Sequence, residues 1–313
     1  MTPASTRETI LVSGGVGVMG SRLVKDLVAA GHRVRALALP GDRWVSRLSG
    51  VDAEIAFGDI TKPETLAAAF DGVTTVFHLA GVILSNDPSV FARVNTGGTR
   101  NMVDAARRAG VRHFVFVSST SAIDPISEYA RSKAEAEAIV RAAEPMAWTI
   151  VRPTLVYERE GGEEFLGFLR SLLKYPVVPF VGSGRARKNP VHVDDMGRGL
   201  LAIAGNPRSH GKIYNFTGGE EISIRDLARL ILRHQGVSKP FLHIPLPICR
   251  AAAFLMEKTM KNPPLTRYAI TRIEQDASPD NSEARRDLGY DPIGVRDGME
   301  RSFPLAGKRD SPA

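Results

Sequence analysis

The segment TILVSGGVGVMGSRLV (9–24) constrains the fold of this chain more than any other. A short apolar run predicts a buried strand, and a helical pattern follows it. Between the two, Gly14, Gly17 and Gly20 have GxxGxxG spacing. A strand-to-helix turn of this kind lets backbone N–H groups at a helix N-terminus meet a pyrophosphate, which a Cβ would block. We therefore expect a dinucleotide-binding turn here rather than a plain tight turn.

Strand and helix patterns alternate through the first half of the chain. Consecutive apolar residues predict strands at 9–13, 33–39, 53–59, 74–81, 113–119 and 147–153. Helices are predicted between them, in a run after the glycines that ends at Ala30, at 61–70, at 91–110 and from Ser127 onward. Thr61 and Glu64 fit a capping box at the start of one of these helices. The alternation predicts an α/β fold with a Rossmann-type, doubly wound parallel sheet covered by helices on both faces.

The regular alternation ends after Pro153, which predicts a smaller C-terminal lobe for substrate binding. We expect a Rossmann core at 1–160 and 188–218, a substrate lobe at 161–187 and 219–305, and a tail at 306–313. The apolar stretch 241–260 could form an amphipathic helix for a partner or a membrane surface. Burial inside the smaller lobe is the expected alternative.

Composition narrows the class of protein. The chain has 313 residues, 43% of them apolar, and a net charge of +7, which is typical of a globular protein. Its basic residues are scattered and no nucleic-acid-binding motif accompanies them, so we expect a phosphate-bearing small molecule and no nucleic acid. No apolar run approaches the roughly 20 residues of a transmembrane segment. The single cysteine, Cys249, and the lack of a signal-peptide pattern favour a cytoplasmic location.

The stretch SEYARSKAEAE (127–137) places Tyr129 four residues before Lys133. Residues at this spacing share a helix face, so both side chains should point into one site. An ammonium lowers the pKa of a neighbouring phenol, so this tyrosine could exchange a proton with substrate while hydride moves to or from nicotinamide. A tyrosine and a lysine at this spacing occur often by chance. The predicted catalytic role therefore rests on the position of the pair after the fifth predicted strand. The remaining charged residues are expected on the solvent face or in a dimer contact: Glu128, Arg131, Glu135 and Glu137.

The second predicted strand ends without the acidic residue that would accept hydrogen bonds from an adenosine ribose. The positions read Leu37, Ala38, Leu39 and Pro40. Arg43 follows and could pair with a 2′-phosphate, although a solvated loop arginine is an equal alternative. The sequence therefore leaves both NAD and NADP open as the cofactor.

These segments together resemble the extended short-chain dehydrogenase/reductase family, in its NAD-dependent epimerase/dehydratase group. The similar segments, in chain order, are VSGGVGVMG, FGDIT, VFHLAG, VNTGGTRN, FVSST, YARSK, RPTLVY, NPVHVDD and NSEARRDLGYDP. The nucleotide-sugar-modifying branch is the most similar. Three features differ from the family pattern: the segment between Thr120 and Tyr129 is short, Ala130 replaces a frequent glycine, and Lys188 replaces an arginine that often meets substrate phosphate.

The resemblance implies a role for each matching residue. The implied catalytic residues are Tyr129, Lys133, Thr120 and Asn95. The implied cofactor-binding residues are Gly14, Gly17, Val18, Met19, Gly20, Arg43, Asp59, Ile60, Leu79, Ala80, Gly81, Ser118, Tyr129, Lys133 and Pro153. The implied substrate-binding residues are Ser119, Thr120, Ser121 and Lys188. No metal is expected: His78 should pack in the core, and Asp194 or Asp195, beside His192, should cap the helix that follows.

The resemblance implies an NAD(P)-dependent oxidoreductase or isomerase that acts on a nucleoside-diphosphate sugar, as a 4-epimerase or a 4-keto reductase. It also implies a homodimer through the helices at 91–109 and 129–143. Two other functions stay open. One is the reduction of a non-sugar carbonyl, such as a steroid-like or aldehyde substrate. The other is a non-catalytic role as a nucleotide-binding accessory or assembly protein.

Overall fold

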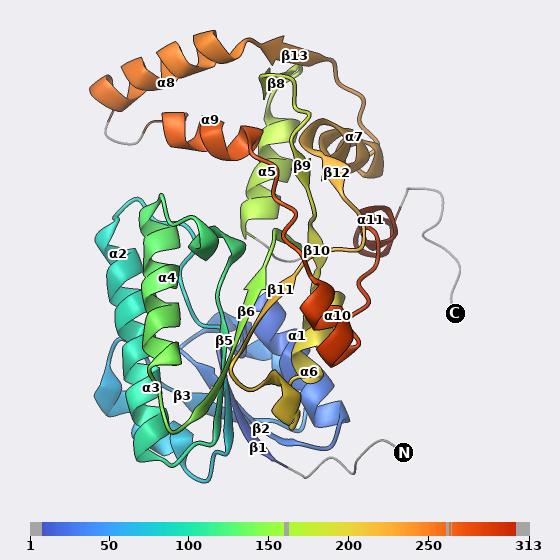
Figure 1. Cartoon of the computed structure of the whole chain (residues 1–313). Helices are drawn as coiled ribbons and strands as arrows, with labels where there is room; N and C mark the ends of the chain where they lie inside the picture. The colour runs from blue at the N-terminus through green and yellow to red at the C-terminus, as the bar shows by residue number, and fades with distance from the viewer. Residues whose placement is uncertain (1–7, 160–162, 261–262, 264, 305–313) are drawn as a thin grey trace. The chain divides into compact units, whose positions relative to one another are not determined.

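Within the residues that the structure describes, seven strands form one parallel sheet in the order β11-β6-β5-β4-β1-β2-β3 (Figure 1). The computed structural model describes residues 8–159, 163–260, 263 and 265–304. The strands are β1 (Thr9–Ser13), β2 (Arg33–Ala38), β3 (Glu54–Phe57), β4 (Thr75–His78), β5 (His113–Val117), β6 (Ala147–Pro153) and β11 (Lys212–Phe216). The strand order reverses between β1 and β4. In sheets of this kind, ligands bind beyond the carboxyl ends of the strands at such a switch point.

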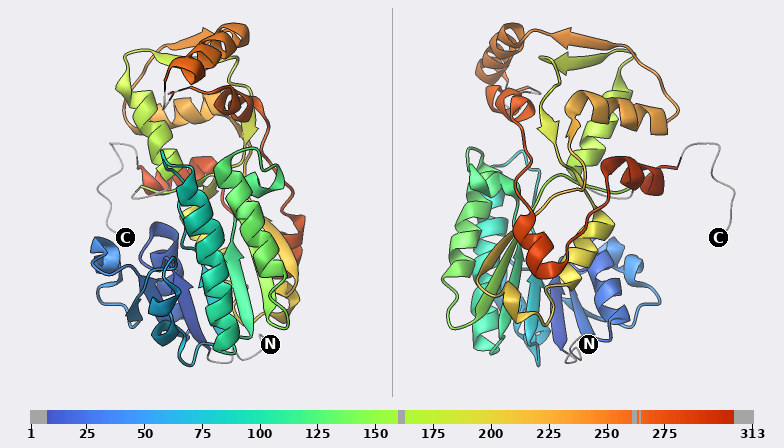
Figure 2. Two further views of the ribbon diagram at one scale, coloured as in Figure 1. Left: turned by 90° about the vertical axis from the view of Figure 1, so that its left-hand side faces the viewer. Right: turned by 45° about the vertical axis from the view of Figure 1, so that its right-hand side comes forward.

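Helices cover both faces of this sheet. α3 and α4 lie side by side on one face, and α1 packs against α6 on the other (Figures 1 and 2). Their bounds are α1 (Val18–Ala29), α3 (Gly98–Arg108), α4 (Glu128–Arg141) and α6 (Val193–Leu201). Because both faces are covered, all five residues of β5 are buried, as the apolar run 114–117 after His113 requires. The predicted Rossmann-type sheet is confirmed.

The helix predicted at 61–70 is wrong. Two short 3₁₀ helices occupy this segment, η2 (Pro63–Thr65) and η3 (Ala67–Phe70). The capping box is also wrong, because Lys62 holds the N-cap position without a side-chain hydrogen bond. The Thr61 hydroxyl instead donates to the Asp59 carboxylate at 2.7 Å, which closes a local turn before the first 3₁₀ helix.

The helix predicted at 91–110 is present but not uniform. It begins as α2 (Ser89–Phe91), widens into a π-helical segment, η4 (Ala92–Gly97), and continues as α3. Gly98 lies at the end of the π-helical segment, where a Cβ would meet the Ile60 side chain at 2.6 Å. Close packing against the loop after β3 therefore accompanies the change in helix geometry. Single π turns inside α-helices occur frequently at functional sites.

The chain divides into two compact units. The first contains 1–153, 193–216 and 280–291, and the second contains 154–192, 217–279 and 292–313. This division differs from the predicted one chiefly at 280–291, which includes α10 (Ser282–Leu288). The Asn215 amide donates to the Asp280 carbonyl at 2.9 Å, and the Tyr214 hydroxyl lies 3.2 Å from the Asp287 carboxylate. These contacts attach α10 to edge strand β11. The predicted tail at 306–313 lies outside the described residues.

The second unit has its own apolar core, formed by residues that include Tyr157, Phe165 and Leu227. Its helices are α5 (Glu163–Lys174), α7 (Ile224–His234), α8 (Leu246–Thr259), α9 (Arg267–Glu274) and α11 (Val295–Ser302). Its strands are β7 (Val156–Tyr157), β8 (Val178–Val181), β9 (Arg187–Lys188), β10 (Val191–His192), β12 (Ile222–Ser223) and β13 (Phe241–Ile244). They form two-stranded pairs, so this unit contributes no extension to the seven-stranded sheet.

Helix α8 only partly follows the expected burial. Cys249 and Ala253 are buried, whereas Ile248 and Leu255 are 59% and 62% exposed. The helix therefore presents apolar side chains both inward and outward. Among the described residues, none of the helices combines the length and the apolar character that crossing a membrane requires.

Candidate active site

The glycine turn joins β1 to α1 at the switch point of the sheet. Gly14 has a φ of +68°, and a Cβ there would lie 2.9 Å from the Ala80 amide nitrogen. A Cβ on Gly20 would lie 2.0 Å from the Gly14 carbonyl oxygen. Glycine at these two positions therefore lets the turn close against β4 and lets helix α1 start directly on the turn.

The amino end of α1 fits the phosphates of a dinucleotide. Gly17 is the N-cap, no side chain caps the helix, and no acidic residue lies in its first turn. Val18 and Met19 are the first helical residues, and backbone N–H groups at this position have no acceptor within the helix. These donors and the helix dipole favour an anion. The turn is therefore a suitable cradle for the pyrophosphate of a nicotinamide dinucleotide.

The residues after β4 connect this turn to the tyrosine–lysine helix. Leu79, Ala80 and Gly81 follow the strand, and the Ala80 amide lies 3.3 Å from the Ser13 hydroxyl oxygen. A Cβ on Gly81 would lie 3.7 Å from the Lys133 Nζ. The three predicted cofactor residues therefore form a backbone strip that runs from the glycine turn to the lysine.

Helix α4 places Tyr129 and Lys133 on one face, as predicted. Ser127 caps the helix by accepting a hydrogen bond from the Ala130 amide at 3.1 Å. Lys133 is only 6% exposed, and its Nζ donates to the Val117 carbonyl oxygen at 2.9 Å. The Tyr129 side chain is half-buried, and its ring packs edge-on against Phe91. The lysine is thus fixed against the end of β5, while the tyrosine keeps access to solvent.

Burial lowers the pKa of Lys133 to about 8, although the negative charge of Glu137 acts in the opposite direction. Glu137 is fully buried, so its prediction as a solvent-face or dimer residue is wrong. Its carboxylate accepts hydrogen bonds from the Arg152 guanidinium at 2.6 and 2.8 Å and from the Ser118 hydroxyl at 2.6 Å. This buried ion pair joins α4 to β6. The hydroxyl of Ser118, a predicted cofactor ligand, is therefore engaged inside the protein.

Asn95 is buried in the π-helical segment and joins three parts of the site. Its Oδ1 accepts a hydrogen bond from the Val82 amide at 2.8 Å. Its Nδ2 donates to the Val82 carbonyl oxygen and to the Ser132 hydroxyl, both at 3.0 Å. The Ser132 hydroxyl in turn donates to the Tyr129 carbonyl oxygen at 2.7 Å. Asn95 therefore holds the strip after β4 against the helix that carries Tyr129.

The serine and threonine residues after β5 form a 3₁₀ helix, η5 (Thr120–Ile123). Ser119 caps it, accepting a hydrogen bond from the Ser121 amide at 3.1 Å. Thr120 is partly exposed, and within the described part of the chain no protein group holds its hydroxyl by a hydrogen bond. Of the three predicted substrate residues here, Thr120 is therefore the best placed to donate to a bound oxygen.

Asp59 and Ile60, which are predicted to contact the adenosine part of the cofactor, follow β3. The Asp59 carboxylate accepts from the Thr61 amide and hydroxyl, and these hydrogen bonds lower its pKa although partial burial acts to raise it. Ile60 is buried against α3. Arg43 is exposed. The sequence prediction missed Arg47, whose guanidinium donates to the Val16 carbonyl oxygen in the glycine turn at 3.2 Å.

The contacts of two further predicted site residues involve other parts of the chain. Pro153 is the buried last residue of β6, paired with Phe216 of β11. Lys188 belongs to the second unit, where its Nζ donates to the Gln275 carbonyl oxygen at 2.6 Å. Its predicted contact with a substrate phosphate stays a prediction.

The histidine and aspartate residues considered for a metal have structural partners. His78 is buried between the Ser13 and Thr99 hydroxyls, and burial lowers its pKa to about 3. Asp194 pairs with Arg22 of α1 and Asp195 with Arg198, both from the first turn of α6 rather than its N-cap. No group of three or more metal-binding side chains occurs within the described ranges.

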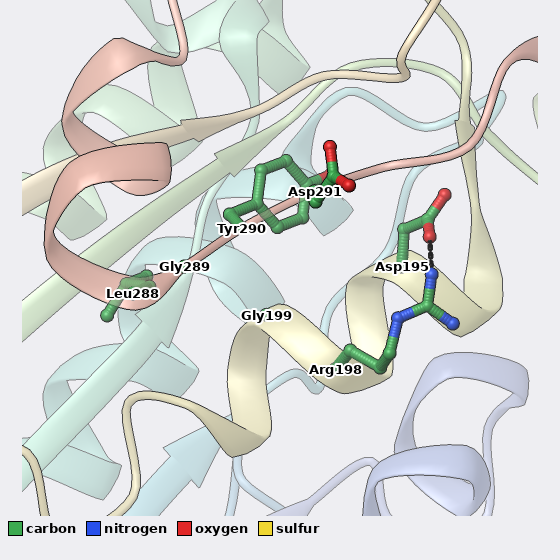
Figure 3. Close-up of a pocket in the computed structure, with 7 residues that line it drawn as sticks. All are labelled: Asp195, Arg198, Gly199, Leu288, Gly289, Tyr290 and Asp291. Carbon is green, nitrogen blue, oxygen red and sulfur yellow. Dashed lines mark hydrogen bonds and ion pairs between the residues drawn. The ribbon is translucent and has the colours of Figure 1, made fainter.

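A small pocket lies between α6 and the segment after α10 (Figure 3). The Asp195–Arg198 ion pair and Tyr290 line it, and Tyr290 stacks on Phe216 with ring centroids 4.5 Å apart. Burial and the negative charge of Asp195 raise the pKa of Tyr290. None of the predicted site residues lines this pocket, so we assign it no part in the candidate active site.

Comparison with known proteins agrees with this geometry. A family model described as the NAD dependent epimerase/dehydratase family matches residues 10–216. The chain is 31% identical to a 3 beta-hydroxysteroid dehydrogenase/Delta 5-->4-isomerase of Mycobacterium tuberculosis, over 91% of this chain and 86% of the relative. It is 28% identical to a 4-hydroxy-2-methyl-3-oxo-4-farnesyl-3,4-dihydroquinoline-1-oxide ketoreductase of Stigmatella aurantiaca, over 89% of this chain and 90% of the relative.

A solved structure of a dTDP-glucose 4,6-dehydratase from Streptomyces venezuelae, with bound NAD, is similar throughout. Its TM-score is 0.76 at 25% identity, over 96% of this chain and 97% of that one. The expected nicotinamide cofactor agrees with the family and with this neighbour. From the family model over residues 10–216 and the 31% identical relative, the chain belongs to the NAD-dependent epimerase/dehydratase family.

Proposed function

We propose that this enzyme interconverts a secondary alcohol and a ketone on a large apolar molecule, such as a steroid or an isoprenoid-bearing ring. This is the non-sugar carbonyl function that the sequence left open. The single observation that carries it is the exposure of large apolar side chains on the segments that follow β4 and β5. The proposed function is consistent with the family's redox chemistry. An apolar alcohol or ketone replaces the nucleoside-diphosphate sugar as the leading substrate class.

The segments that follow β4 and β5 lie at the carboxyl ends of neighbouring strands and present apolar side chains. Leu84 is 60% exposed, Ile123 is 52% exposed and Ile126 is 45% exposed. Burying a side chain of this size contributes about 1.5–3 kcal/mol, so three of them favour an apolar ligand over a sugar. Where exposed apolar side chains gather on a protein surface, they often mark a binding site.

The two relatives named above support the same substrate class, since one is named for a hydroxysteroid and the other for a farnesyl-bearing quinoline oxide. Their similarity extends over about nine-tenths of this chain. The site offers donors for one reacting oxygen, from Tyr129 and Thr120. In this proposal the reacting oxygen meets these donors, and the rest of the substrate contacts apolar side chains.

The chemistry of the side chains follows from their positions. When bound, the nicotinamide supplies the hydride acceptor or donor. In alcohol oxidation, the Tyr129 phenolate takes the proton of the substrate hydroxyl, and in ketone reduction the phenol returns it. The Lys133 ammonium favours the phenolate electrostatically. Thr120 donates a hydrogen bond to the reacting oxygen, while Asn95 fixes the helix that carries the tyrosine.

The test is a substrate panel followed by nicotinamide absorbance and product mass. It includes a 3β-hydroxysteroid and an isoprenoid ketone, with UDP- and dTDP-hexoses for comparison. Tyr129→Phe should lower kcat for the apolar substrate by about 10²–10⁴-fold and leave nucleotide affinity nearly unchanged. Tyr175→Phe, which changes an exposed tyrosine of the second unit, is the matched control and should keep full activity. Full activity in Tyr129→Phe would refute the assigned role.

A nucleotide-linked sugar is the second candidate, favoured by similarity to the dTDP-glucose 4,6-dehydratase. Conversion of a nucleoside-diphosphate hexose, with no turnover of the apolar substrates, would replace the leading proposal. Turnover of neither class, together with copurification of a protein partner, would favour the non-catalytic accessory role. The expected homodimer belongs to the same proposal, and light scattering of the purified chain measures it directly.

A further inference from the structure

Two consecutive residues at the end of β5 hold two consecutive turns of α4. The Lys133 Nζ donates to the Val117 carbonyl oxygen at 2.9 Å. One turn farther along, the Glu137 carboxylate accepts a hydrogen bond from the Ser118 hydroxyl at 2.6 Å. Tyr129, Lys133 and Glu137 have four-residue spacing, so they share one side of the helix. The row of side chains that contains the proposed proton donor and its ammonium therefore ends in a carboxylate.

The Glu137 carboxylate is also fixed by β6. The Arg152 guanidinium donates to it at 2.6 and 2.8 Å, and the Glu137 side chain is only 1% exposed. The Ser118 amide donates to the Val151 carbonyl oxygen at 2.7 Å, so both partners of the carboxylate come from paired strands. These contacts hold the carboxylate in one position. Because it has so little contact with solvent, its charge is weakly screened.

The groups around the Lys133 ammonium include an aromatic ring and a neutral histidine. Its Nζ lies 4.7 Å from the Phe116 ring centroid, and His78 stacks on the same ring. Burial lowers the pKa of His78 to about 3, so His78 is neutral. Within the described part of the chain, Lys133 forms no direct ion pair. Burial lowers the pKa of Lys133 to about 8, and the negative charge of Glu137 acts through space in the opposite direction.

The elements packed against α4 add no second anion that acts on Lys133, as far as the structure describes them. On β6, Arg152 is bound to the Glu137 carboxylate. On α3, Arg107 donates to a backbone carbonyl oxygen just after the end of α4. Arg93 of η4 is exposed, and neither α2 nor η5 contains a titratable residue. His113, at the opposite end of β5, is neutral because burial lowers its pKa to about 3.

We infer that Glu137 is a positioning residue for proton transfer: its buried carboxylate holds Lys133 at the end of β5 and favours the ammonium over the neutral amine. This role rests on the proposed function, because Glu137 acts through the Tyr129–Lys133 pair. A fixed anion favours the charged form of a neighbouring cation, and the ammonium in turn favours the phenolate of Tyr129. Without the Glu137 charge, more of Lys133 is neutral, and Tyr129 exchanges its proton less readily.

An NMR pH titration of the full chain, labelled isotopically at lysine, measures the Lys133 pKa without any substrate. Lys133→Met identifies the Lys133 signal. In Glu137→Gln the Lys133 pKa should fall by about 0.5–1 unit, because the amide keeps the size of the side chain and removes its charge. Glu137→Asp keeps the charge and should restore most of the lost shift.

Glu135→Gln is the matched control, because it removes an exposed carboxylate from the same helix and should leave the Lys133 pKa unchanged. The neutral pair Glu137→Gln with Arg152→Gln covers the case in which Glu137→Gln does not fold, since it leaves neither charge unpaired. The Lys133 pKa should fall in the neutral pair as well, because Glu137 is the group that acts on Lys133. An unchanged Lys133 pKa in either of these proteins would overturn the inference.

The pH profile of ketone reduction separates this role from a merely structural one. With the panel compound that is turned over, Glu137→Gln should lower kcat by roughly threefold to tenfold near pH 8. The loss should be smaller near pH 6.5, where Lys133 regains its proton, and KM should change by less than about threefold. An equal loss of kcat at both pH values would contradict the positioning role. Because the NMR titration uses no substrate, a wrong substrate class under the proposed function would not affect it.

Discussion

The Lys133 ammonium donates a hydrogen bond to the Val117 carbonyl oxygen at 2.9 Å, which joins the middle of α4 to the last residue of β5. The same Nζ lies 4.7 Å from the centroid of the Phe116 ring. A cation is thus held among buried groups, one helical turn from Tyr129. This position lets the lysine act electrostatically on Tyr129. Burial there also makes the charged form of the lysine less favourable.

The cost of that charge predicts a pH dependence of stability. Burial lowers the pKa of Lys133 to about 8, below its ordinary value of 10.5. Between these values the unfolded chain binds the proton and the folded chain does not, so the Lys133 contribution to stability rises with pH across this range. The rise is at most about 1.4 kcal/mol per pH unit. Urea unfolding from pH 7.5 to 10 should show it in the unchanged protein and not in Lys133→Met.

Lys25→Met is the control for that comparison, because it removes an exposed ammonium from α1 of the same unit. It should reproduce the pH dependence of the unchanged protein. If Lys133→Met showed that same pH dependence as well, the buried ammonium would not be its source.

Gly20 predicts a steric effect on the cofactor cradle. In Gly20→Ala the new Cβ would lie 2.0 Å from the Gly14 carbonyl oxygen, so α1 must move away from the turn. We expect a loss of about 1–3 kcal/mol in unfolding free energy and weaker nucleotide binding. Thermal unfolding and calorimetry measure the two effects.

Gly167→Ala is the matched control for the glycine substitution. Gly167 is exposed in α5, and nothing lies within 4 Å of a Cβ built there. Alanine in a helix interior is favoured over glycine by about 1 kcal/mol, so this variant should be at least as stable as the parent. A Gly20→Ala protein with unchanged stability and unchanged nucleotide affinity would show that the turn tolerates a Cβ.

The Glu137–Arg152 ion pair predicts strong coupling between two substitutions. Glu137→Leu alone leaves a largely buried guanidinium without its carboxylate and should cost about 3–5 kcal/mol. The double variant Glu137→Leu with Arg152→Met should cost less than the sum of the two single changes. Denaturant unfolding of all four proteins gives the coupling free energy.

The exposed Glu128–Arg131 pair on the same helix provides the reference cycle. Its side chains are 53% and 48% exposed, so its coupling should lie between about 0 and 1 kcal/mol. Additive costs in the Glu137–Arg152 cycle would contradict a cooperative buried pair.

Local sequence patterns predicted the parts of this protein that depend on near neighbours. The glycine spacing from Gly14 to Gly20 predicted the turn, because a Cβ conflict there involves residues only six apart. The four-residue spacing of Tyr129 and Lys133 predicted a shared helix face for the same reason. The same kind of pattern misassigned Glu137 to solvent, because an alanine-rich charged helix gives no sign of Arg152 on a strand 15 residues later.

The sequence by itself thus determined the strand–helix alternation, the switch-point turn and the pairing of a tyrosine with a lysine, since each depends on spacing along the chain. Only the tertiary structure decided that Lys133 is buried against Val117, that Glu137 is an internal anchor, and that Arg47 reaches Val16. These contacts join segments separated by 15 to 31 residues. Their formation depends on how the helices and turns pack against the sheet, and spacing along the chain does not encode that packing.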